Sequence, residues 1–270
     1  MSDDASRQPA AERSGDLSRV VFFLGGVRSG TTVFRRMLAS HPRMRDRGEI
    51  FNSHNTMGYF KYVRERVAEQ PDLIFPENNA KLFMSYLPTL IPKDPNAIAL
   101  VDIKYEHLTL VPDAWQLPFT NPPMLRLLKR SKCKVIHLRR QHFYSVMSNL
   151  VAVQTGNYHE SATAKKDPAA EMPAITADRA AILAAMKKRK RAADVVDSSF
   201  DDQHRLPLDY EGVFDDDGSF KAEICERVAN FLGIDNQFDR QPALRKVIDR
   251  PLSAVIGNYD EIADLESSAL

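Results

Sequence analysis

The stretch covering residues 20–34 restricts the fold of this 270-residue chain more than any other. Its first five residues, 20–24, are all apolar, which is typical of a strand buried on both faces of a parallel sheet. Turn conformations are then available at Gly25, Gly26 and Gly30. From Thr31 the apolar residues recur with the spacing of one helix face. A strand, a glycine turn and a helix bring backbone N–H groups and the positive end of the helix to one point, so the stretch predicts a phosphate site.

The spacing of this turn is close to that of a Walker A loop. Gly25 and Gly30 bracket four residues, and Thr32 takes the Ser/Thr place. Thr31, however, stands where the lysine for the β- and γ-phosphates belongs, which argues against a nucleoside triphosphate. A positive charge stands inside the loop instead, at Arg28. The alternative interpretation is a tight strand–helix turn that carries a surface arginine.

The residues around this loop resemble a known family. Arg28–Thr32, followed by Leu38, His41–Pro42 and Gly48–Glu49, resembles the 5′-phosphosulfate loop of sulfotransferases. These enzymes use 3′-phosphoadenosine 5′-phosphosulfate (PAPS), and the nearest branch contains tyrosylprotein, glycosaminoglycan and bacterial glycolipid sulfotransferases. Arginine suits the donor's oxyanions because its donors form a fixed fork. The loop residues expected to bind the donor are Gly26, Arg28, Ser29, Gly30, Thr31 and Thr32, and Arg28 is also expected to act in catalysis.

Composition and length narrow the class of protein further. There are 37 basic and 36 acidic residues, so nothing indicates nonspecific nucleic-acid binding. The two cysteines are too few for a disulfide framework or a four-ligand zinc site, and we expect free thiols. No apolar run approaches the ~20 residues that cross a bilayer. Composition and length predict a disordered tail over residues 1–17 and one domain over 18–270. Because animal Golgi members of the family that the loop resembles carry an N-terminal membrane anchor, the resemblance implies a cytoplasmic, bacterial enzyme here.

Two further apolar segments predict neighbouring strands. Residues 98–104 end in Lys104, and residues 134–138 lead into Arg140 and a helix. Together with the first segment they predict an α/β fold of three layers, α/β/α, with a parallel sheet like that of P-loop proteins. The family resemblance implies that Lys104 lies near the active site. The alternatives are an ordinary lysine at a strand end, and an Asp102 that imitates a Walker B aspartate.

The helix after the third strand carries the second signature. Arg140 and Ser148 lie eight positions apart, with Tyr144 between them, on one helix face. In the family an arginine leaving a strand and a serine eight positions later grip the 3′-phosphate, so the resemblance implies this role here. Gln141 stands where Asp or Asn is usual. Alone, the pattern would be interpreted as a basic helix start and a surface serine.

Sulfuryl transfer to a hydroxyl also needs a general base. The candidates near the motifs are His41, His54, His137 and Glu49. We interpret His41 as structural and His137 as a core residue of its strand. Glu49 matches the glutamate that serves as base in the tyrosylprotein and bacterial glycolipid branches. The alternative for Glu49 is a surface carboxylate or an ion pair with Arg45 or Arg47.

The remaining segments are less informative. Residues 155–177 lack apolar periodicity and predict a long loop, a kind of segment that is often functional or disordered. The basic run 187–191 is interpreted as a solvated helix face, with an acidic acceptor as its alternative partner. Ser219 is a candidate cap for a helix that ends at Gly233. The pair Tyr210–Glu211 and the residues around 231–234 and 256–262 also resemble the family's C-terminal half.

Together these features predict a PAPS-dependent sulfotransferase whose nucleotide product is 3′-phosphoadenosine 5′-phosphate. A monoanionic sulfonate needs no divalent cation, so no metal is expected. The resemblance alone favours a carbohydrate or glycolipid hydroxyl as acceptor, with a phenolic hydroxyl second. Two other functions stay open. One is a small-molecule kinase that uses ATP–Mg²⁺, and the other is a nucleotide-binding protein without turnover.

Overall fold

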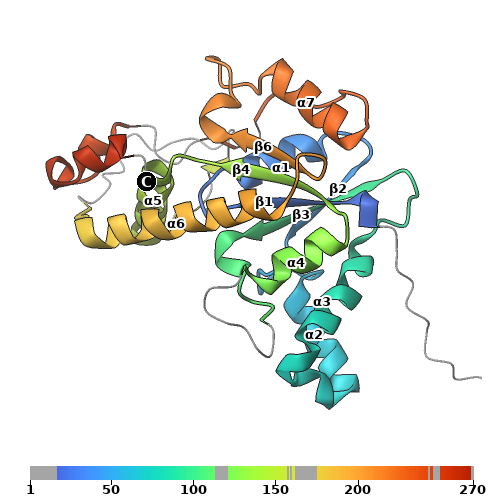
Figure 1. Cartoon of the computed structure of the whole chain (residues 1–270). Helices are drawn as coiled ribbons and strands as arrows, with labels where there is room; N and C mark the ends of the chain where they lie inside the picture. Colours follow the sequence, from blue (N-terminus) through green and yellow to red (C-terminus); the bar gives the residue numbers. More distant parts are fainter. Residues whose placement is uncertain are drawn as a thin grey trace, which may run out of the picture.

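A parallel sheet of five strands forms the centre of the protein (Figure 1), in the order β2-β3-β1-β4-β6. Its strands are β1 (Val20–Gly25), β2 (Met44–Glu49), β3 (Ile98–Lys104), β4 (Lys134–Arg139) and β6 (Arg205–Asp209). A separate antiparallel pair joins β5 (Glu160–Ser161) to β7 (Leu244–Arg245). The computed structural model describes residues 17–112, 121–156, 158, 160–161, 175–242, 244–245 and 250–268. The tail predicted over residues 1–17 lies outside them, except that Leu17 begins the 3-10 helix η1 (Leu17–Arg19).

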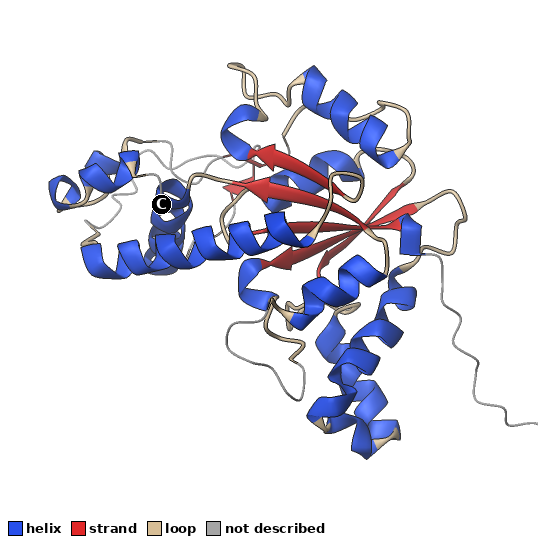
Figure 2. Ribbon diagram, in the orientation of Figure 1, coloured by secondary structure: helices blue, strands red, loops and turns tan. Residues whose placement is uncertain are grey.

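Helices cover both faces of the sheet (Figure 2), which confirms the predicted three-layer α/β/α fold. α1 (Thr31–Ala39) and α7 (Ala222–Leu232) pack on one face, and α3 (Asn79–Tyr86), α4 (Pro123–Arg130) and α6 (Arg179–Ser199) on the other. α2 (Tyr59–Glu69) lies outside α3, and α5 (His142–Thr155) lies against α6. The short 3-10 helices are η2 (Pro71–Ile74), η3 (Pro76–Asn78), η4 (Leu87–Leu90), η5 (Tyr105–His107), η6 (Tyr210–Gly212), η7 (Leu252–Ala254), η8 (Tyr259–Glu261) and η9 (Ala263–Ser267).

The apolar run of β1 is buried because its side chains pack against the helix layers on both faces of the sheet. Val20, Phe22 and Leu24 belong to the core shared with α3, α4 and α6. Val21 and Phe23, which point the opposite way, belong to the core shared with α1 and α7. A third apolar cluster joins α5 and α6 to the C-terminal 3-10 helices. Burial on both faces explains why this strand shows no alternation of polar and apolar residues.

Three expectations from the sequence need correction or restriction. Ser219 does not cap α7, because that helix begins at Ala222 after Lys221. The segment 155–177 is not all loop, since it contains β5 and a bridge from Ile175 to Ile256. Residues 157, 159 and 162–174 of that segment lie outside the described part. In the basic run 187–191, Arg189 is buried rather than solvated.

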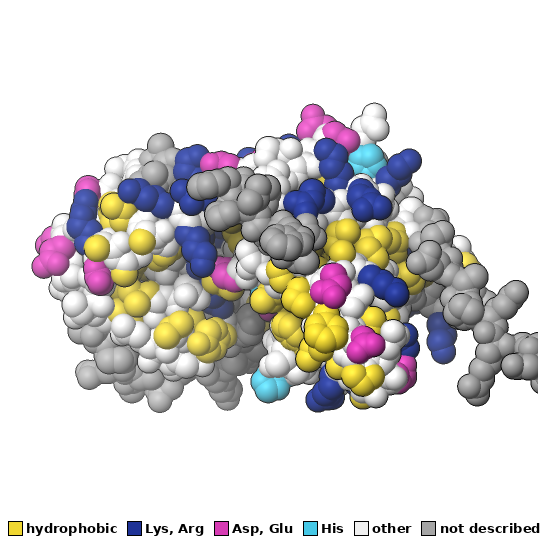
Figure 3. All heavy atoms as spheres, turned by 60° about the horizontal axis from the view of Figure 1, so that its bottom comes forward, with side chains coloured by type: hydrophobic (Ala, Val, Ile, Leu, Met, Phe, Trp, Pro, Cys, Tyr) yellow, Lys and Arg dark blue, Asp and Glu magenta, His cyan; other side chains and the backbone are white. Residues whose placement is uncertain are grey.

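An apolar surface lies on the face formed by α2 and the 3-10 helices after it (Figure 3). Its exposed side chains are Met57, Phe60, Ile74 and Phe75, of which Ile74 is 68% exposed. Within the described ranges, no helix combines the length and the apolar character that crossing a membrane requires.

The topology places a binding site at the carboxyl end of β1. This strand lies between β3 and β4, and the chain leaves it toward the β2 edge but later crosses over it from β3 to β4. In open parallel sheets such a reversal leaves a crevice at the carboxyl ends of the strands, where ligands bind. The loop 26–30, Lys104, Arg140 and Glu49 all lie at or just after strand carboxyl ends. The fold therefore collects the predicted site residues on one edge of the sheet.

Candidate active site

The loop between β1 and α1 has the tight conformation that the glycines predict. The N–H and the hydroxyl of Ser29 both donate to the carbonyl of Gly26, at 3.2 and 2.7 Å. Arg28 and Gly30 have positive φ angles of 65° and 86°. A Cβ atom at Gly30 would collide with the ring of Tyr210, so the position needs glycine for space as well as for conformation. Gly30 is the N-cap of α1, whose first N–H groups have no partner within the helix.

Lys104 supplies the ammonium group that the loop itself lacks. It ends β3 directly opposite Gly25, and its Nζ donates to the hydroxyl of Thr31. Thr31 is the residue that stands in the Walker lysine position, so a neighbouring strand brings a lysine to this place. The same Nζ lies 2.8 Å from Oδ2 of Asp102 and 3.3 Å from Oε1 of Glu49. Lys104 is buried, and its positive charge therefore faces the loop through little solvent.

Glu49 ends β2 with its carboxylate turned toward Lys104. Its side chain is 27% exposed, so it is accessible from solvent while it pairs with the ammonium. The alternative ion pairs are wrong: Arg45 donates to the Pro42 carbonyl and lies near Asp94, and Arg47 donates to the Leu90 carbonyl. Register explains the difference, because Glu49 pairs with Asp102 of β3 across a bulge that follows Asp46.

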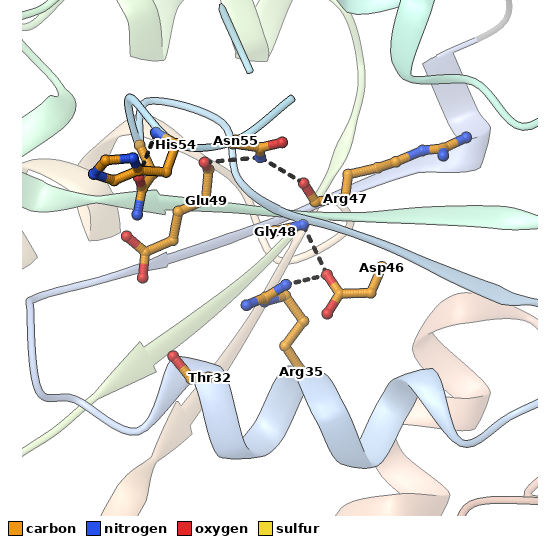
Figure 4. A pocket seen from close by; sticks show the side chains of 9 residues that line it. Thr32, Arg35, Asp46, Arg47, Gly48, Glu49, His54 and Asn55 are labelled. Carbon is orange, nitrogen blue, oxygen red and sulfur yellow. Dashed lines mark hydrogen bonds and ion pairs between the residues drawn. The ribbon is translucent and has the colours of Figure 1, made fainter. Parts of the chain in front are cut away.

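An open cleft of about 440 Å³ lies beside this carboxylate (Figure 4). Helix α1 forms one side of the cleft, and the end of β2 with the turn after it forms the other. Every side chain that lines it is polar: Thr32, Arg35, Asp46, Arg47, Glu49, Asn52, His54 and Asn55. The cleft reaches from the start of α1 to Glu49, so a molecule inside it contacts both the loop helix and the carboxylate.

Charged side chains at the cleft and beneath it connect α1 to the sheet. Arg35 pairs with Asp46, and its Nε lies 3.7 Å from Oδ2 of Asp102. Asp102 is fully buried and also holds Lys104. Because two cations already face this carboxylate, a further metal cation there would meet their repulsion. The arrangement disfavours the Walker B alternative for Asp102. No group of three or more metal-ligating side chains occurs among the described residues.

Arg28 contacts both residues of the second signature, Arg140 and Ser148. Nε of Arg28 donates to the hydroxyl of Ser148 at 3.1 Å, and Arg140 donates to the Arg28 carbonyl at 2.7 Å. Arg28 also donates to the carbonyl of Tyr158. Burial, and next the charge of Arg140, lower the pKa of Arg28. Two guanidinium groups thus lie close together beside the loop, in a position to receive an anion.

Two residues of this region were missed by the sequence analysis as parts of the site. The ring of Tyr210 lies 4.6 Å from the Arg140 guanidinium, and it fills the space above Gly30. Arg189 donates to the carbonyl of Val27 at 2.9 Å. Tyr210 gave a signal only through its resemblance to the family. For Arg189 the signal is its position on one face of α6. The buried residues on that face include Ile182, Met186, Arg189, Ala193 and Val196.

The histidines differ in their suitability as a base. His41 is buried, with Nδ1 accepting from the Arg43 N–H and Nε2 lying 3.0 Å from Asp235. His137 is buried between Asp197 and Tyr105. These contacts agree with structural roles. His54 lines the cleft. His107, which the sequence analysis did not consider, accepts from the Lys104 N–H, and burial lowers its pKa while nearby Glu49 acts in the opposite direction.

No family model matches the sequence, and no curated protein does either. A sulfotransferase domain from the curacin biosynthetic pathway aligns over 93% of this chain and 98% of its own, with a TM-score of 0.45 and 14% identity. A sulfotransferase from Alicyclobacillus acidocaldarius aligns over 93% and 96%, with a TM-score of 0.45 and 11% identity. Mouse sulfotransferase SULT7A1, complexed with PAP, aligns over 94% and 68%, with a TM-score of 0.45 and 14% identity. At such identities, the roles of individual side chains rest on the contacts described above.

Proposed function

We propose that this protein is a sulfotransferase that moves the sulfuryl group of PAPS to an acceptor hydroxyl. The observation that carries the proposal is the division of charge at the end of β1. On one side of the loop Lys104 contacts Thr31 and Glu49. On the other side Arg28 and Arg140 surround the loop with no carboxylate paired to them among the described residues. Two cationic places around one phosphate loop fit a nucleotide that carries anionic groups at both its 5′ and its 3′ side.

The proposed reaction uses these side chains in separate roles. The loop N–H groups, with Ser29, Thr31, Thr32 and Arg28, hold the 5′-phosphosulfate. Lys104 stabilises the negative charge that develops on the bridging oxygen as the sulfur–oxygen bond to the phosphate breaks. Arg140 and Ser148 hold the 3′-phosphate.

Glu49 serves as the general base in this scheme. It takes the proton of the acceptor hydroxyl while that oxygen bonds to sulfur, and 3′-phosphoadenosine 5′-phosphate leaves with the electrons of the broken bond. The ammonium of Lys104, 3.3 Å from the Glu49 carboxylate, keeps that carboxylate near the loop before the acceptor arrives. Positioning and fixed charges supply most of the catalysis, as in phosphoryl transfer.

For the acceptor, the lining of the cleft supports a carbohydrate. Asn52, Asn55 and His54 offer hydrogen-bond donors and acceptors beside Glu49, which suits a molecule with many hydroxyl groups. Met57, which is partly exposed, lies next to this cleft, because its sulfur contacts Arg47 of the lining, and Phe60 of α2 is exposed to a similar extent. An apolar surface that begins at the cleft rim supports a glycolipid, with its sugar in the cleft and its chain on the apolar surface.

Thermal unfolding with nucleotides tests the proposed donor. We expect 3′-phosphoadenosine 5′-phosphate to raise the melting temperature with EDTA present, and ATP–Mg²⁺ to raise it much less. A ligand at a hundredfold excess over its dissociation constant adds about 2.7 kcal/mol to the free energy of unfolding. Stronger stabilisation by ATP–Mg²⁺ would instead favour a kinase.

A further inference from the structure

The middle of the phosphate loop is held from outside by two guanidinium groups on consecutive carbonyls. Arg189, from α6, donates to the carbonyl of Val27 at 2.9 Å. Arg140, from the end of β4, donates to the next carbonyl, that of Arg28, at 2.7 Å. A peptide N–H points away from the C=O of the same plane. Fixing these two carbonyls therefore fixes the direction of the following N–H groups, and with it the shape that the loop offers to a phosphate.

Arg189 is an unusual residue to find in this place. It is 7% exposed, and its partners are the neutral Val27 carbonyl and the hydroxyl of Ser145, which in turn donates to the His142 carbonyl. Among the described residues no carboxylate forms an ion pair with it. Burial lowers its pKa most strongly; the charge of Glu106 acts in the opposite direction, and the charge of Arg140 lowers the pKa further. Burying a cation without a counterion is costly, and an anion bound nearby relieves that cost.

A comparison with the neighbouring Arg139 shows how the arginines beside the loop differ from one that has carboxylate partners. Arg139, one residue before Arg140, lies 2.9 Å from Asp209 and 3.3 Å from Asp197. Arg140, in contrast, contacts a carbonyl and an aromatic ring, and its buried Nε has no hydrogen-bond partner in the described part of the chain. Arg28, Arg140 and Arg189 thus form a cluster of three guanidinium groups beside residues 27 and 28. All of their described partners are neutral.

We infer that Arg189 is a positioning residue of the nucleotide site, which fixes the phosphate loop through the Val27 carbonyl and supplies positive charge that an anionic nucleotide neutralises. The inference deepens the proposed function and rests on it for the identity of the nucleotide. It assigns a role to the basic run 187–191, in which the only buried member is Arg189. It also connects α6, whose chain position is far from both signatures, to the loop after β1.

The test compares three variants with the wild type: Arg189→Met, Arg189→Lys and, as a matched control, Arg191→Met at an exposed position of the same run. The melting temperature of each free protein is measured first. Calorimetric titration then gives its affinity for 3′-phosphoadenosine 5′-phosphate with EDTA and for ATP–Mg²⁺. We expect Arg189→Met to weaken nucleotide binding at least about tenfold, as the loss of a charge-assisted interaction does. Arg189→Lys restores most of the affinity, and Arg191→Met leaves it unchanged.

The outcomes separate this inference from the proposed function. If Arg189→Met binds the nucleotide as the wild type does, or if Arg189→Lys fails as badly as Arg189→Met, the inference is overturned whatever the melting temperatures are. If the wild type binds ATP–Mg²⁺ more tightly and Arg189→Met weakens that binding, the role of Arg189 is supported and PAPS is rejected as the donor. If the wild type binds neither nucleotide, both the inference and the proposed function are rejected, because the three guanidinium groups then bind no nucleotide anion.

Discussion

At the scale of single residues, the account depends on the environment of Glu49. Lys104 reaches three oxygen-bearing side chains at once, those of Thr31, Asp102 and Glu49. Of the two carboxylates, Asp102 is fully buried, whereas Glu49 opens to the cleft. Only Glu49 can therefore meet an acceptor hydroxyl. In the proposed reaction the buried carboxylate orients the ammonium, and the accessible one takes the proton.

Glu49→Gln keeps the size of the side chain and removes its basicity. We expect turnover to fall by a factor of about 10² to 10⁴, the usual contribution of a general base. Affinity for 3′-phosphoadenosine 5′-phosphate stays close to that of the wild type, because the proposed nucleotide contacts come from the loop, Arg140 and Ser148 and not from Glu49. Turnover and nucleotide titration on the same preparation measure both, with Glu65→Gln on the exposed face of α2 as control. Turnover equal to the wild type would remove Glu49 from the mechanism and make His54 and His107 the next bases to test.

Arg140→Ala removes a guanidinium that the proposal assigns to the 3′-phosphate. Binding of 3′-phosphoadenosine 5′-phosphate should weaken at least about tenfold, because charge-assisted hydrogen bonds contribute about 1.5–3 kcal/mol. Binding of adenosine 5′-phosphosulfate, which lacks the 3′-phosphate, should weaken less, because it loses only the support that Arg140 gives to the Arg28 carbonyl. Titrating the variant with both ligands makes the comparison. Equal weakening of the two would mean that Arg140 acts through its bond to the Arg28 carbonyl instead.

At the scale of elements, buried polar contacts fix how helices and strands meet. Arg35 and Asp102 join α1 to β3, and His137 of β4 bridges Asp197 of α6 and Tyr105 of η5. Each such group is costly to bury alone and is held by its partners. Removing one partner is therefore expected to lower the free energy of unfolding by more than the lost contact itself, because the other buried polar group is left without a partner.

Variants of the Lys104–Asp102 pair distinguish the contribution of Lys104 to stability from its contribution to turnover. Lys104→Met leaves the buried Asp102 carboxylate with Arg35 at 3.7 Å as its remaining cation, and should lower the free energy of unfolding by about 3–5 kcal/mol. Adding Asp102→Asn removes the buried carboxylate charge that has lost its closest cation, and should restore most of the lost free energy of unfolding. Turnover stays low in the double variant, because the ammonium is still missing. Denaturant unfolding and turnover of both variants test this. Recovery of full turnover would show that Lys104 is only structural.

The buried His137 predicts how stability changes with pH. Burial lowers its pKa below the ordinary value of 6.5, even though the hydrogen bond to Asp197 acts in the opposite direction. Below pH 6.5 the unfolded chain takes up a proton that the folded protein does not, so the free energy of unfolding falls as pH falls. His137→Gln should make this dependence shallower, but not flat, because burial also lowers the pKa of His107 and His142. Urea unfolding between pH 7.5 and about 5 measures both slopes, and a variant slope as steep as that of the wild type would contradict the explanation.

The sequence predicts local elements well and contacts between elements poorly. The glycine spacing and the apolar run of β1 are local signals, and both the strand and the turn are where they indicate. The pairing of Glu49 with Lys104 could not be predicted from the sequence, because it depends on the register between β2 and β3 and on a bulge that no local pattern reveals. Arg189 was assigned to solvent because charged residues surround it. Its place on the buried stripe of α6 was the better guide.

At the scale of the whole molecule, the order of the strands brings the site together. The carboxyl ends of β2, β3, β1 and β4 carry Glu49, Lys104, the phosphate loop and Arg140 in that spatial order. Residues far apart in the sequence thus meet along one edge of the sheet, with the polar cleft at the β2 end and the guanidinium cluster at the β4 end. In the proposed function, the acceptor and the 3′ side of the nucleotide would therefore bind at opposite ends of the site.

Transfer of labelled sulfur from PAPS decides whether this protein is a sulfotransferase. The protein is incubated with PAPS labelled in its sulfur, EDTA and separate pools of oligosaccharides, glycolipids and phenols, beside a parallel reaction with ATP–Mg²⁺ labelled in its γ-phosphate. We predict that label from PAPS enters a sugar-bearing acceptor, and that Glu49→Gln abolishes most of this transfer. The account is contradicted if no pool receives sulfur while the γ-phosphate of ATP is transferred.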